Sequence, residues 1–243
     1  NVNGIRAAAR RGGVEWLAAQ EADVICLQEV RATDQQLAGA LGDTFQGWHL
    51  AHRPSAVRLG HAGVTILSRK PLQVTQDLGC ADDEGRWVAA RIGDLEIASV
   101  YVHTGQADTP AQDDKHRFLD AMGKWMEQRS PALVCGDLNV AHQQADIKNW
   151  RGNVGKAGFL ESERAYLTQW YDDLGWVDLG RDAGFTWWSW RGKAFDNDAG
   201  WRIDCVLASP DLAAACRAFT VGRAPTYAER WSDHAPVTVE LQW

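Results

Sequence analysis

Asp137 and Asn139 are a pair of residues whose types and spacing could do chemistry. They follow a short apolar run, residues 132–135, which predicts a buried strand. Because they are two positions apart, their side chains point to the same side of an extended chain, where a carboxylate and an amide can orient a water molecule and hold a phosphate oxygen. The alternative is a strand-to-loop turn, in which Gly, Asp and Asn are common. Gly136 is expected to let the backbone approach a bound group closely.

Further polar side chains stand at or near the ends of predicted strands. They are Asn1, Glu29, Tyr101, Asp204, Asp233 and His234. Chains that gather polar groups at one edge of a packed sheet usually do so for a site, so we expect these residues to converge with Asp137. Three of these residues also have an ordinary structural alternative. Glu29 could be a solvated strand cap, Tyr101 could pack at an interface between elements, and His234 could be a core histidine with its hydrogen bonds satisfied.

These side chains favour a hard divalent cation over other catalytic devices. Oxygen ligands from Asn1, Glu29 and Asp233 suit Mg²⁺, with Mn²⁺ as the alternative, and the clustered Cys and His ligands of a zinc site are missing from the sequence. Neither a GxSxG nucleophile motif nor a GxxxxGK[ST] phosphate loop occurs. Metal-assisted attack of water on a phosphate ester needs a bound cation, a water-orienting carboxylate and donors for the developing negative charge. The candidate side chains offer ligands for the cation and groups for the other two roles.

Composition limits the class of protein. The 243 residues are enough for one large domain, and we expect a single domain over residues 1–243. The net charge of -7 argues against a non-specific electrostatic binder of nucleic acid, but it is compatible with an enzyme that has a local basic rim. The five cysteines are scattered and form no CxxC pair, which favours buried thiols in a reducing compartment. No stretch has the length of a membrane span, so we expect no contact with membranes. We also expect a monomeric, cytoplasmic protein.

Hydrophobic periodicity predicts the elements that position these residues. Residues 1–6 resemble the end of a strand whose first half is missing, and residues 6–20 are expected to form a helix interrupted at Gly12-Gly13. The next predicted elements are a strand at 23–29, a helix at 33–41, and strands at 48–52, 63–68, 72–78, 86–92 and 95–102. Gly93-Asp94 predicts that the last two strands form a hairpin.

The carboxy-terminal half is expected to continue the same mixed pattern. A helix begins with Thr109 as N-cap, Pro110 at the first position and Gln112 three residues after the cap, and it extends to about residue 128. After the strand at 132–135 we expect an irregular segment at 142–158, a helix at 162–171, and strands at 201–209, 216–221 and 235–241. The hairpins argue against a purely parallel sheet and favour an α/β (α+β) domain with two packed sheets flanked by helices.

Five motifs in chain order resemble those of the exonuclease III family of DNA-repair nucleases, in the endonuclease/exonuclease/phosphatase superfamily. They occupy residues 1–6, 27–29, 136–142, 201–204 and 232–237. The resemblance covers essentially the whole chain and implies that family's fold, a four-layer αββα sandwich of two mixed, mostly antiparallel sheets flanked by helices. The Asn-x-Asn-Gly-x-Arg opening, residues 146–149 and the Trp-rich stretch before Trp201 favour the repair branch over pancreatic-type DNases, sphingomyelinases, inositol-polyphosphate phosphatases and deadenylases.

The resemblance implies a metal site. Glu29 would be the principal ligand of Mg²⁺, with Asn1 and Asp233 close by, and Asp137 and Asn139 could serve a second metal position. Whether one or two metal ions act is left open by the sequence.

The resemblance also implies catalytic roles. Asp137 would orient or deprotonate the attacking water, and Asn139 would position that water and a phosphate oxygen. Tyr101 would donate to the scissile phosphate, and His234, oriented by Asp204, would face the same phosphate.

The tryptophans and one group of cations are candidate DNA contacts. Trp187 and Trp201 resemble the walls of a pocket for a sugar that lacks its base, with Phe185 as a further wall, whereas Trp188 and Trp190 are expected in the core. The cations expected to grip flanking phosphates are Lys148, Arg151, Lys156 and Arg191. Simple solvation of a loop is the alternative for these cations.

The sequence therefore predicts a Mg²⁺-dependent phosphodiesterase of DNA repair. It would cut double-stranded DNA 5′ to abasic sites and remove nucleotides or blocking groups from recessed 3′ ends. The alternatives are a 3′-end exonuclease or general phosphodiesterase with little abasic-site activity, and, more distantly, a non-enzymatic DNA-binding scaffold. One departure from the family pattern is His103-Thr104 after Tyr101-Val102, where the family often has Pro and an amide side chain.

Overall fold

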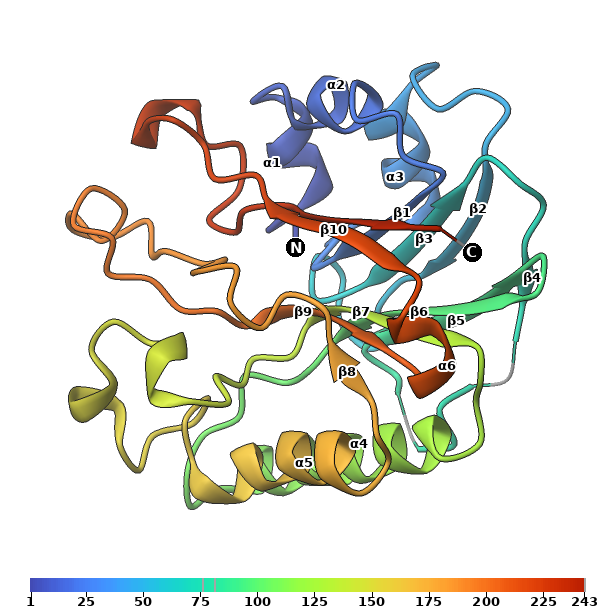
Figure 1. The fold of residues 1–243 in the computed structure, drawn as a ribbon. Coiled ribbons are helices and arrows are strands. Elements are labelled where there is room, and N and C mark those ends of the chain that lie inside the picture. The colour runs from blue at the N-terminus through green and yellow to red at the C-terminus, as the bar shows by residue number, and fades with distance from the viewer. Residues whose placement is uncertain (76, 81, 243) are drawn as a thin grey trace.

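The fold is a sandwich of four layers, seen in a computed structural model that describes residues 1–75, 77–80 and 82–242. Figure 1 shows two layers of strands with helices above and below them. The upper helices are α1 (Ile5–Ala9), α2 (Gly13–Ala18) and α3 (Asp34–Leu41), and the lower ones are α4 (Pro110–Met126) and α5 (Glu161–Asp172). The αββα architecture expected from the sequence is confirmed.

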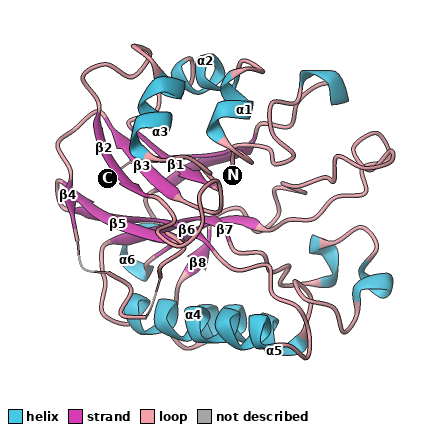
Figure 2. Ribbon diagram, turned by 180° about the vertical axis from the view of Figure 1, so that it is seen from behind, coloured by secondary structure: helices cyan, strands magenta, loops and turns pink. Residues whose placement is uncertain are grey.

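The lower strand layer is a mixed sheet of six strands in the order β4-β5-β6-β7-β9-β8. Its strands are β4 (Gln73–Val74), β5 (Trp87–Ile92), β6 (Leu95–Tyr101), β7 (Ala132–Asp137), β8 (Val177–Asp178) and β9 (Asp204–Ala208). β6 and β7 pair in parallel, and the other pairs are antiparallel. A parallel pair needs a crossover connection, and α4 supplies it by packing on the outer face of the sheet (Figure 2).

The upper strand layer has two hydrogen-bonded parts, both antiparallel. The first has the order β1-β3-β2 and the second pairs β10 with β11. Their strands are β1 (Val24–Gln28), β2 (His49–Arg53), β3 (Val64–Ser68), β10 (Cys216–Val221) and β11 (Val237–Leu241). Both parts share a buried apolar cluster with the six-stranded sheet, so they cover the same face of it (Figure 1). The short elements η1 (Gln144–Asp146), η2 (Trp150–Asn153), α6 (Pro210–Ala213) and η3 (Tyr227–Glu229) lie in the connections.

Local signals in the sequence set several boundaries. Gly12, at φ +82°, separates α1 from α2 where the interruption was expected. Thr33 and Gln36 form a capping box at the start of α3. The hairpin at Gly93-Asp94 joins β5 to β6 as predicted. These features depend on neighbouring residues alone, which is why the sequence predicts them.

Two expectations about single elements were wrong. The strand expected at 72–78 is only Gln73–Val74, with residue 76 outside the described residues. The strand expected at 201–209 begins at residue 204, because Arg202 donates its backbone N–H to Asp146 and Trp201 pairs with Trp187.

The expected helix start at Thr109 and Pro110 is confirmed, since α4 begins at Pro110 with Thr109 as N-cap. The side chains nevertheless form no capping box: the Thr109 hydroxyl donates to the Gln106 carbonyl, and the Gln112 side chain donates to Glu163.

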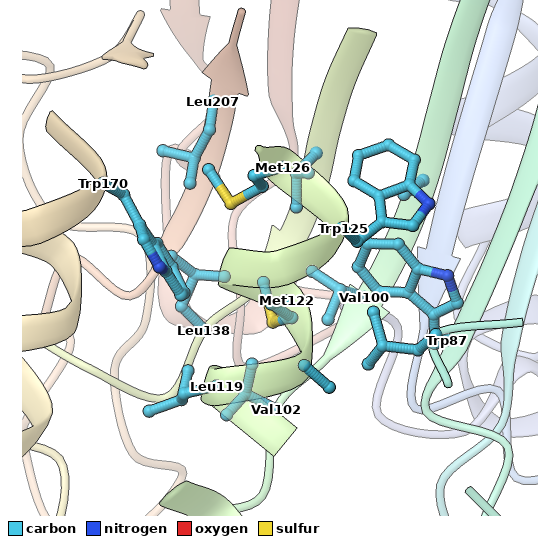
Figure 3. Close-up of a cluster of buried hydrophobic side chains, with 14 of the residues drawn as sticks. Trp87, Val100, Val102, Leu119, Met122, Trp125, Met126, Leu138, Trp170 and Leu207 are labelled. Carbon is cyan, nitrogen blue, oxygen red and sulfur yellow. The ribbon is translucent and has the colours of Figure 1, made fainter. Parts of the chain in front are cut away.

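The largest core cluster lies between the six-stranded sheet and the helices α4 and α5. Figure 3 shows side chains of α4 inserting between the sheet and the Trp170 ring of α5. Among its most buried members are Trp87, Val100, Leu119, Met122, Met126, Trp170 and Leu207. Packing of this amphipathic helix fixes the sheet edge where β6 and β7 end. None of the described helices combines the length and apolarity needed to cross a bilayer.

Gly136 is required by the sheet itself. The expected close approach to a bound group is instead an approach to β6: a Cβ at Gly136, where φ is +152°, would lie 2.0 Å from the carbonyl oxygen of Val100. No backbone atom can give way at that distance without disturbing the parallel β6–β7 pair.

We therefore predict that Gly136→Ala lowers the free energy of unfolding by about 3 kcal/mol, at the upper end of the usual cost of overpacking. Chemical denaturation monitored by circular dichroism measures it. The matched control is Gly39→Ala in α3, where nothing lies within 4 Å of an added Cβ. That exposed helical position should gain up to about 1 kcal/mol. Equal effects of the two substitutions would contradict the claim that the close approach of β6 requires glycine at position 136.

Candidate active site

Tyr101, Asp137 and Asp204 lie side by side because of how the central strands pair. β6 runs parallel to β7 with Tyr101 opposite Asp137, and β9 runs antiparallel to β7 with Asp204 opposite Asp137. The last residues of β6 and β7 and the first residue of β9 therefore meet at one edge of the sheet. All three residues are buried, so little water screens their charges.

His234 joins this group from the turn that precedes β11. Nδ1 of its ring lies 2.8 Å from Oδ2 of Asp204, and its Nε2 lies 3.7 Å from Oδ2 of Asp137. The Thr186 hydroxyl donates to the same Asp204 oxygen over 2.6 Å, which fixes that carboxylate. Asp204 thus holds the imidazole with its second nitrogen toward Asp137.

Burial and mutual charge set the protonation of the three groups. Burial alone would lower the pKa of His234, but the Asp204 and Asp137 carboxylates outweigh it and raise that pKa above its usual value. Burial would raise the pKa of Asp204, whereas His234 holds that pKa below its usual range. Burial raises the pKa of Asp137 to about 6, with His234 opposing the shift and Asp204 adding to it. Asp204 is therefore the counter-ion of His234, and Asp137 is the acid that titrates nearest to neutral pH.

Asn139 is held in a tight turn directly after β7. Its φ is +49°, and its backbone N–H donates to Oδ1 of Asp137 over 2.9 Å. Its side-chain Nδ2 donates to the carbonyl of Val102 over 2.8 Å. The turn therefore orients the Asp137 carboxylate and ties it to the residue that follows Tyr101. The amide oxygen Oδ1 is the Asn139 atom that can accept from a water molecule.

Tyr101 is placed as a hydrogen-bond donor. The guanidinium carbon of Arg86 lies 4.7 Å from the centroid of its ring. Burial raises the pKa of Tyr101 above its usual value, and the Glu29 and Asp137 carboxylates add to the shift. The phenol therefore stays protonated throughout the physiological pH range.

The first residues of the chain lie between the end of β1 and the turn that carries His234. Backbone N–H groups of residues 2, 4 and 5 donate to carbonyls of residues 28–30 over 2.8 to 3.0 Å. The Asn1 side chain donates to Oδ2 of Asp137 over 2.9 Å. Its Oδ1 accepts the backbone N–H of Asn3, so Asn1 directs its free donor at the Asp137 carboxylate.

Asn3 is a site residue for which the sequence analysis assigned no role. Its Nδ2 donates to Oδ1 of Asp233 over 2.8 Å, and it adopts φ +45°, which turns the chain into α1. A signal was available: Asn1 and Asn3 have the same two-residue spacing as Asp137 and Asn139. The following Gly4 marked the turn but gave no indication of which acid Asn3 meets.

Two expected metal ligands, Glu29 and Asp233, already have partners. Glu29 adopts φ +55° and forms an ion pair with Arg31. Asp233 accepts from Asn3 at one oxygen and, over 3.1 Å, from Nε1 of Trp187 at the other. A cation bound by these carboxylates would compete with Arg31 and with the two neutral donors.

The donors at this edge fit a hard cation chemically. Within residues 1–75, 77–80 and 82–242, one group of three acidic or histidine side chains has ligand atoms within 4.8 Å of one another: Asp137, Asp204 and His234. Two of the expected ligands, Glu29 and Asp233, lie outside that group, although the Glu29 charge acts on Tyr101 and Asp233 precedes His234 in the chain. Carboxylate and amide oxygens are the ligands that Mg²⁺ takes.

Trp187 and Trp201 form one corner beside the site. Their ring centroids are 6.2 Å apart at an interplanar angle of 85°, and the Trp187 ring lies 6.4 Å from that of His234. Both pack on a small buried cluster that includes Ile147 and Phe159. Each ring is only half-buried, so apolar surface remains available next to His234.

Two other aromatic expectations need correction. Phe185 packs against Trp188 and Phe195 in a separate cluster, so it does not share the Trp187–Trp201 corner. Trp188 is in the core as expected, but Trp190 is half-buried. The guanidinium groups of Arg11 and Arg230 lie 4.9 and 4.3 Å from the Trp190 ring centroid, so cation–π contacts replace apolar packing there.

The predicted phosphate-binding cations are all exposed. Lys148, Arg151 and Lys156 lie on the segment that includes η1 and η2, and Arg191 lies on the loop after Trp190. The Lys148 backbone N–H donates to the carbonyl of Gly200, next to Trp201, over 3.1 Å. This bond places the cationic segment beside the tryptophan corner.

The His103-Thr104 departure changes the rim near Tyr101. Nε2 of His103 lies 3.5 Å from Oε2 of Glu84. Burial lowers the pKa of His103 to about 4, and Arg86 contributes to the shift. A neutral His103 therefore adds no positive charge at this rim, and the Thr104 side chain is exposed.

Sequence comparison finds close relatives along the whole chain. The family described as "Endonuclease/Exonuclease/phosphatase family" matches residues 1–234. An exodeoxyribonuclease of Bacillus subtilis is 32% identical over 255 residues, covering 98% of this chain and 95% of that protein.

Solved structures have the same fold. An AP endonuclease from Archaeoglobus fulgidus superposes with a TM-score of 0.88 at 26% identity, covering 100% of this chain and 97% of that one. A variant of the 3′ phosphatase NExo from Neisseria, bound to a product DNA hairpin, superposes with a TM-score of 0.86 at 30% identity, covering 100% and 97% of the two chains.

The Asp204–His234 pair gives a prediction that needs no substrate. In Asp204→Asn, burial of His234 loses its main opposing charge, so the pKa of His234 should fall below about 6.5 in the metal-free protein. NMR titration of the imidazole measures it. In the parent protein the raised pKa contributes stability that is complete below about pH 6.5 and is lost as the pH rises through the folded-state value. An unchanged pKa in the variant would show that Asp204 does not control this histidine.

Proposed function

The chain belongs to the Endonuclease/Exonuclease/phosphatase family, and we propose that it is a Mg²⁺-dependent DNA-repair phosphodiesterase of the exonuclease III type. It would cut duplex DNA 5′ to abasic sites and trim or unblock recessed 3′ ends. The observation that carries the proposal is the buried Asp204–His234 pair aimed at Asp137 beside Tyr101. The names of the relatives, an exodeoxyribonuclease, an AP endonuclease and a 3′ phosphatase, support the same range of substrates.

In the proposed reaction, each residue acts on one part of a phosphate diester. Asp137, as a carboxylate above about pH 6, orients the attacking water and accepts its proton. Asn139 accepts from the same water through Oδ1. The water oxygen bonds to phosphorus while the P–O bond to the leaving oxygen breaks, and that oxygen takes up a proton from solvent. The protonated Tyr101 and the imidazolium of His234 donate hydrogen bonds to phosphate oxygens as negative charge develops.

Mg²⁺, held by Glu29 and Asp233 with Asn1 or Asn3 nearby, would supply positive charge for the phosphate and the leaving oxygen. Mn²⁺ has the same oxygen preference and is expected to substitute. Arg31, which now pairs with Glu29, would then be free to contact a phosphate. We retain the expectation of a monomeric cytoplasmic enzyme. The five free thiols fit the reducing compartment that this expectation assumes.

A second candidate is a 3′-end exonuclease or phosphatase with little abasic-site activity. The observation that favours it is His103-Thr104, which replaces the family's usual Pro and amide at the rim near Tyr101. An exposed threonine hydroxyl can donate one hydrogen bond to a phosphate, whereas an amide offers two N–H donors. The contact to an internal phosphate would then be weaker than in the family.

Two duplexes distinguish the candidates: one with an internal abasic site and one with a recessed 3′ end. With Mg²⁺ we expect cleavage of both, and with EDTA we expect cleavage of neither. Cleavage of the recessed end alone would favour the second candidate. Binding of both duplexes without cleavage in Mg²⁺ would contradict any enzymatic function.

Asp137→Asn should separate chemistry from binding. Because the carboxylate acts on the water in the transition state, kcat should fall on the order of 10²-fold or more while the dissociation constant for DNA changes little. Single-turnover cleavage and fluorescence anisotropy measure the two quantities. Normal turnover at saturation with weakened binding would remove Asp137 from the chemistry.

Trp201→Ala should lower abasic-site cleavage more than 3′-end removal. An abasic sugar must leave the helix and enter a pocket, and an apolar wall next to His234 is lost in this variant. The measured quantity is the ratio of kcat/KM for the two duplexes. Trp48→Ala is the control, because Trp48 is also half-buried but packs on Phe45 and Arg69 in another part of the molecule. An equal loss of both activities in Trp201→Ala would mean that this tryptophan is only structural.

A further inference from the structure

Lys115, in α4, is a charged side chain with no solvent exposure. Its Nζ donates to Oε1 of Glu163 over 2.7 Å, to the carbonyl of Asn139 over 2.9 Å and to the carbonyl of Thr104 over 3.2 Å. An ammonium group has three N–H donors, so these three acceptors use all of them. None of the chemistry described above involves Lys115.

The acceptors belong to three different parts of the fold. Glu163 is in the first turn of α5, Thr104 follows β6, and Asn139 follows β7. The two loops are those that leave Tyr101 and Asp137 at the sheet edge. One buried cation therefore ties both site loops to the helix layer below the sheet.

Glu163 makes this burial possible. Its Oε1 also accepts from the Gln112 side chain over 2.9 Å, and its Oε2 accepts the backbone N–H of Leu160 over 3.0 Å. The carboxylate is fully buried and fully hydrogen-bonded, so the Lys115 charge is balanced without water. Such a pair adds little net stability compared with apolar residues of the same size, because removing two charges from water is costly. Stability alone therefore does not account for it.

We propose that Lys115 is a positioning residue for the reaction at Asp137, acting through the loop of Asn139; this rests on the proposed nuclease function. Asn139 adopts a left-handed backbone conformation that non-glycine residues seldom take. The hydrogen bond from Lys115 to its carbonyl holds that conformation. The backbone N–H of Asn139 in turn donates to the Asp137 carboxylate. By holding Asn139, Lys115 therefore also holds that carboxylate in the orientation it needs toward the attacking water.

The test uses the double variant Lys115→Met/Glu163→Gln. It removes both charges together, so no unpaired ion is left in the core, and it keeps similar side-chain volumes. The bonds to the two loop carbonyls are lost. We expect kcat to fall 10- to 100-fold, the range expected when a reacting group is displaced by about 1 Å, with KM for DNA changed less than about threefold.

A second readout does not depend on activity. Hydrogen–deuterium exchange of the free protein should become faster in residues 103–107 and 138–142. Exchange in α4 and α5 should stay as in the parent protein, because the core around Trp170 is intact. This pattern identifies local release of the two loops.

Tyr166→Phe is the matched control. The Tyr166 hydroxyl donates to Oδ1 of Asp120 over 2.8 Å, another link between α5 and α4, and it makes no hydrogen bond to residues 103–107 or 138–142. Both kcat and loop exchange should be unchanged in this variant.

Three results would decide against the proposal or against its premise. A double variant with kcat within twofold of the parent and unchanged loop exchange overturns the positioning role. Faster exchange throughout α4 and α5 shows a general structural role instead, and also overturns it. If the parent protein cleaves no DNA, the proposed nuclease function fails, whereas the exchange experiment still decides whether Lys115 holds the loops.

Discussion

Burial of two carboxylates at one sheet edge is the constraint on which the site depends. Asp137 and Asp204 both lie against His234, and burial increases the cost of each of these negative charges. His234 offsets the charge of Asp204, whereas burial, with a smaller contribution from Asp204, raises the pKa of Asp137 to about 6. The arrangement is therefore balanced for a divalent cation and for a base that works near neutral pH.

Strand order makes this convergence possible. A parallel pair, β6 and β7, brings two carboxyl ends to the same edge, and the antiparallel β9 brings an amino end there. Gly136 allows the parallel pair to close, and α4 provides both the crossover and Lys115. The β6–α4–β7 crossover therefore contributes both to the apolar core beneath the sheet and to the placement of the polar groups at its edge.

The sequence predicts those parts of the fold and site that depend on local signals or on recognisable motifs. The αββα layers, the break at Gly12 and the candidate residues Asp137, Asp204 and His234 were of this kind. Partners across long separations were not predictable: Asn3 meets Asp233 across a separation of 230 positions in the chain, and Lys115 meets Asn139 only because α4 packs under β7. Aromatic residues were the weakest point, since composition cannot tell whether Phe185 or Trp190 faces a core, a cation or a ligand.

The most direct test of the proposed cation site is metal binding to the protein without DNA, measured by calorimetric titration with Mg²⁺ and Mn²⁺. We expect a binding site whose affinity falls at least tenfold in Glu29→Gln, because an amide is a poorer ligand for a hard cation than a carboxylate. Glu240→Gln, at an exposed position on β11, should bind as the parent does. Equal affinities in Glu29→Gln and the parent protein would contradict the claim that these strand-end acids form a cation site.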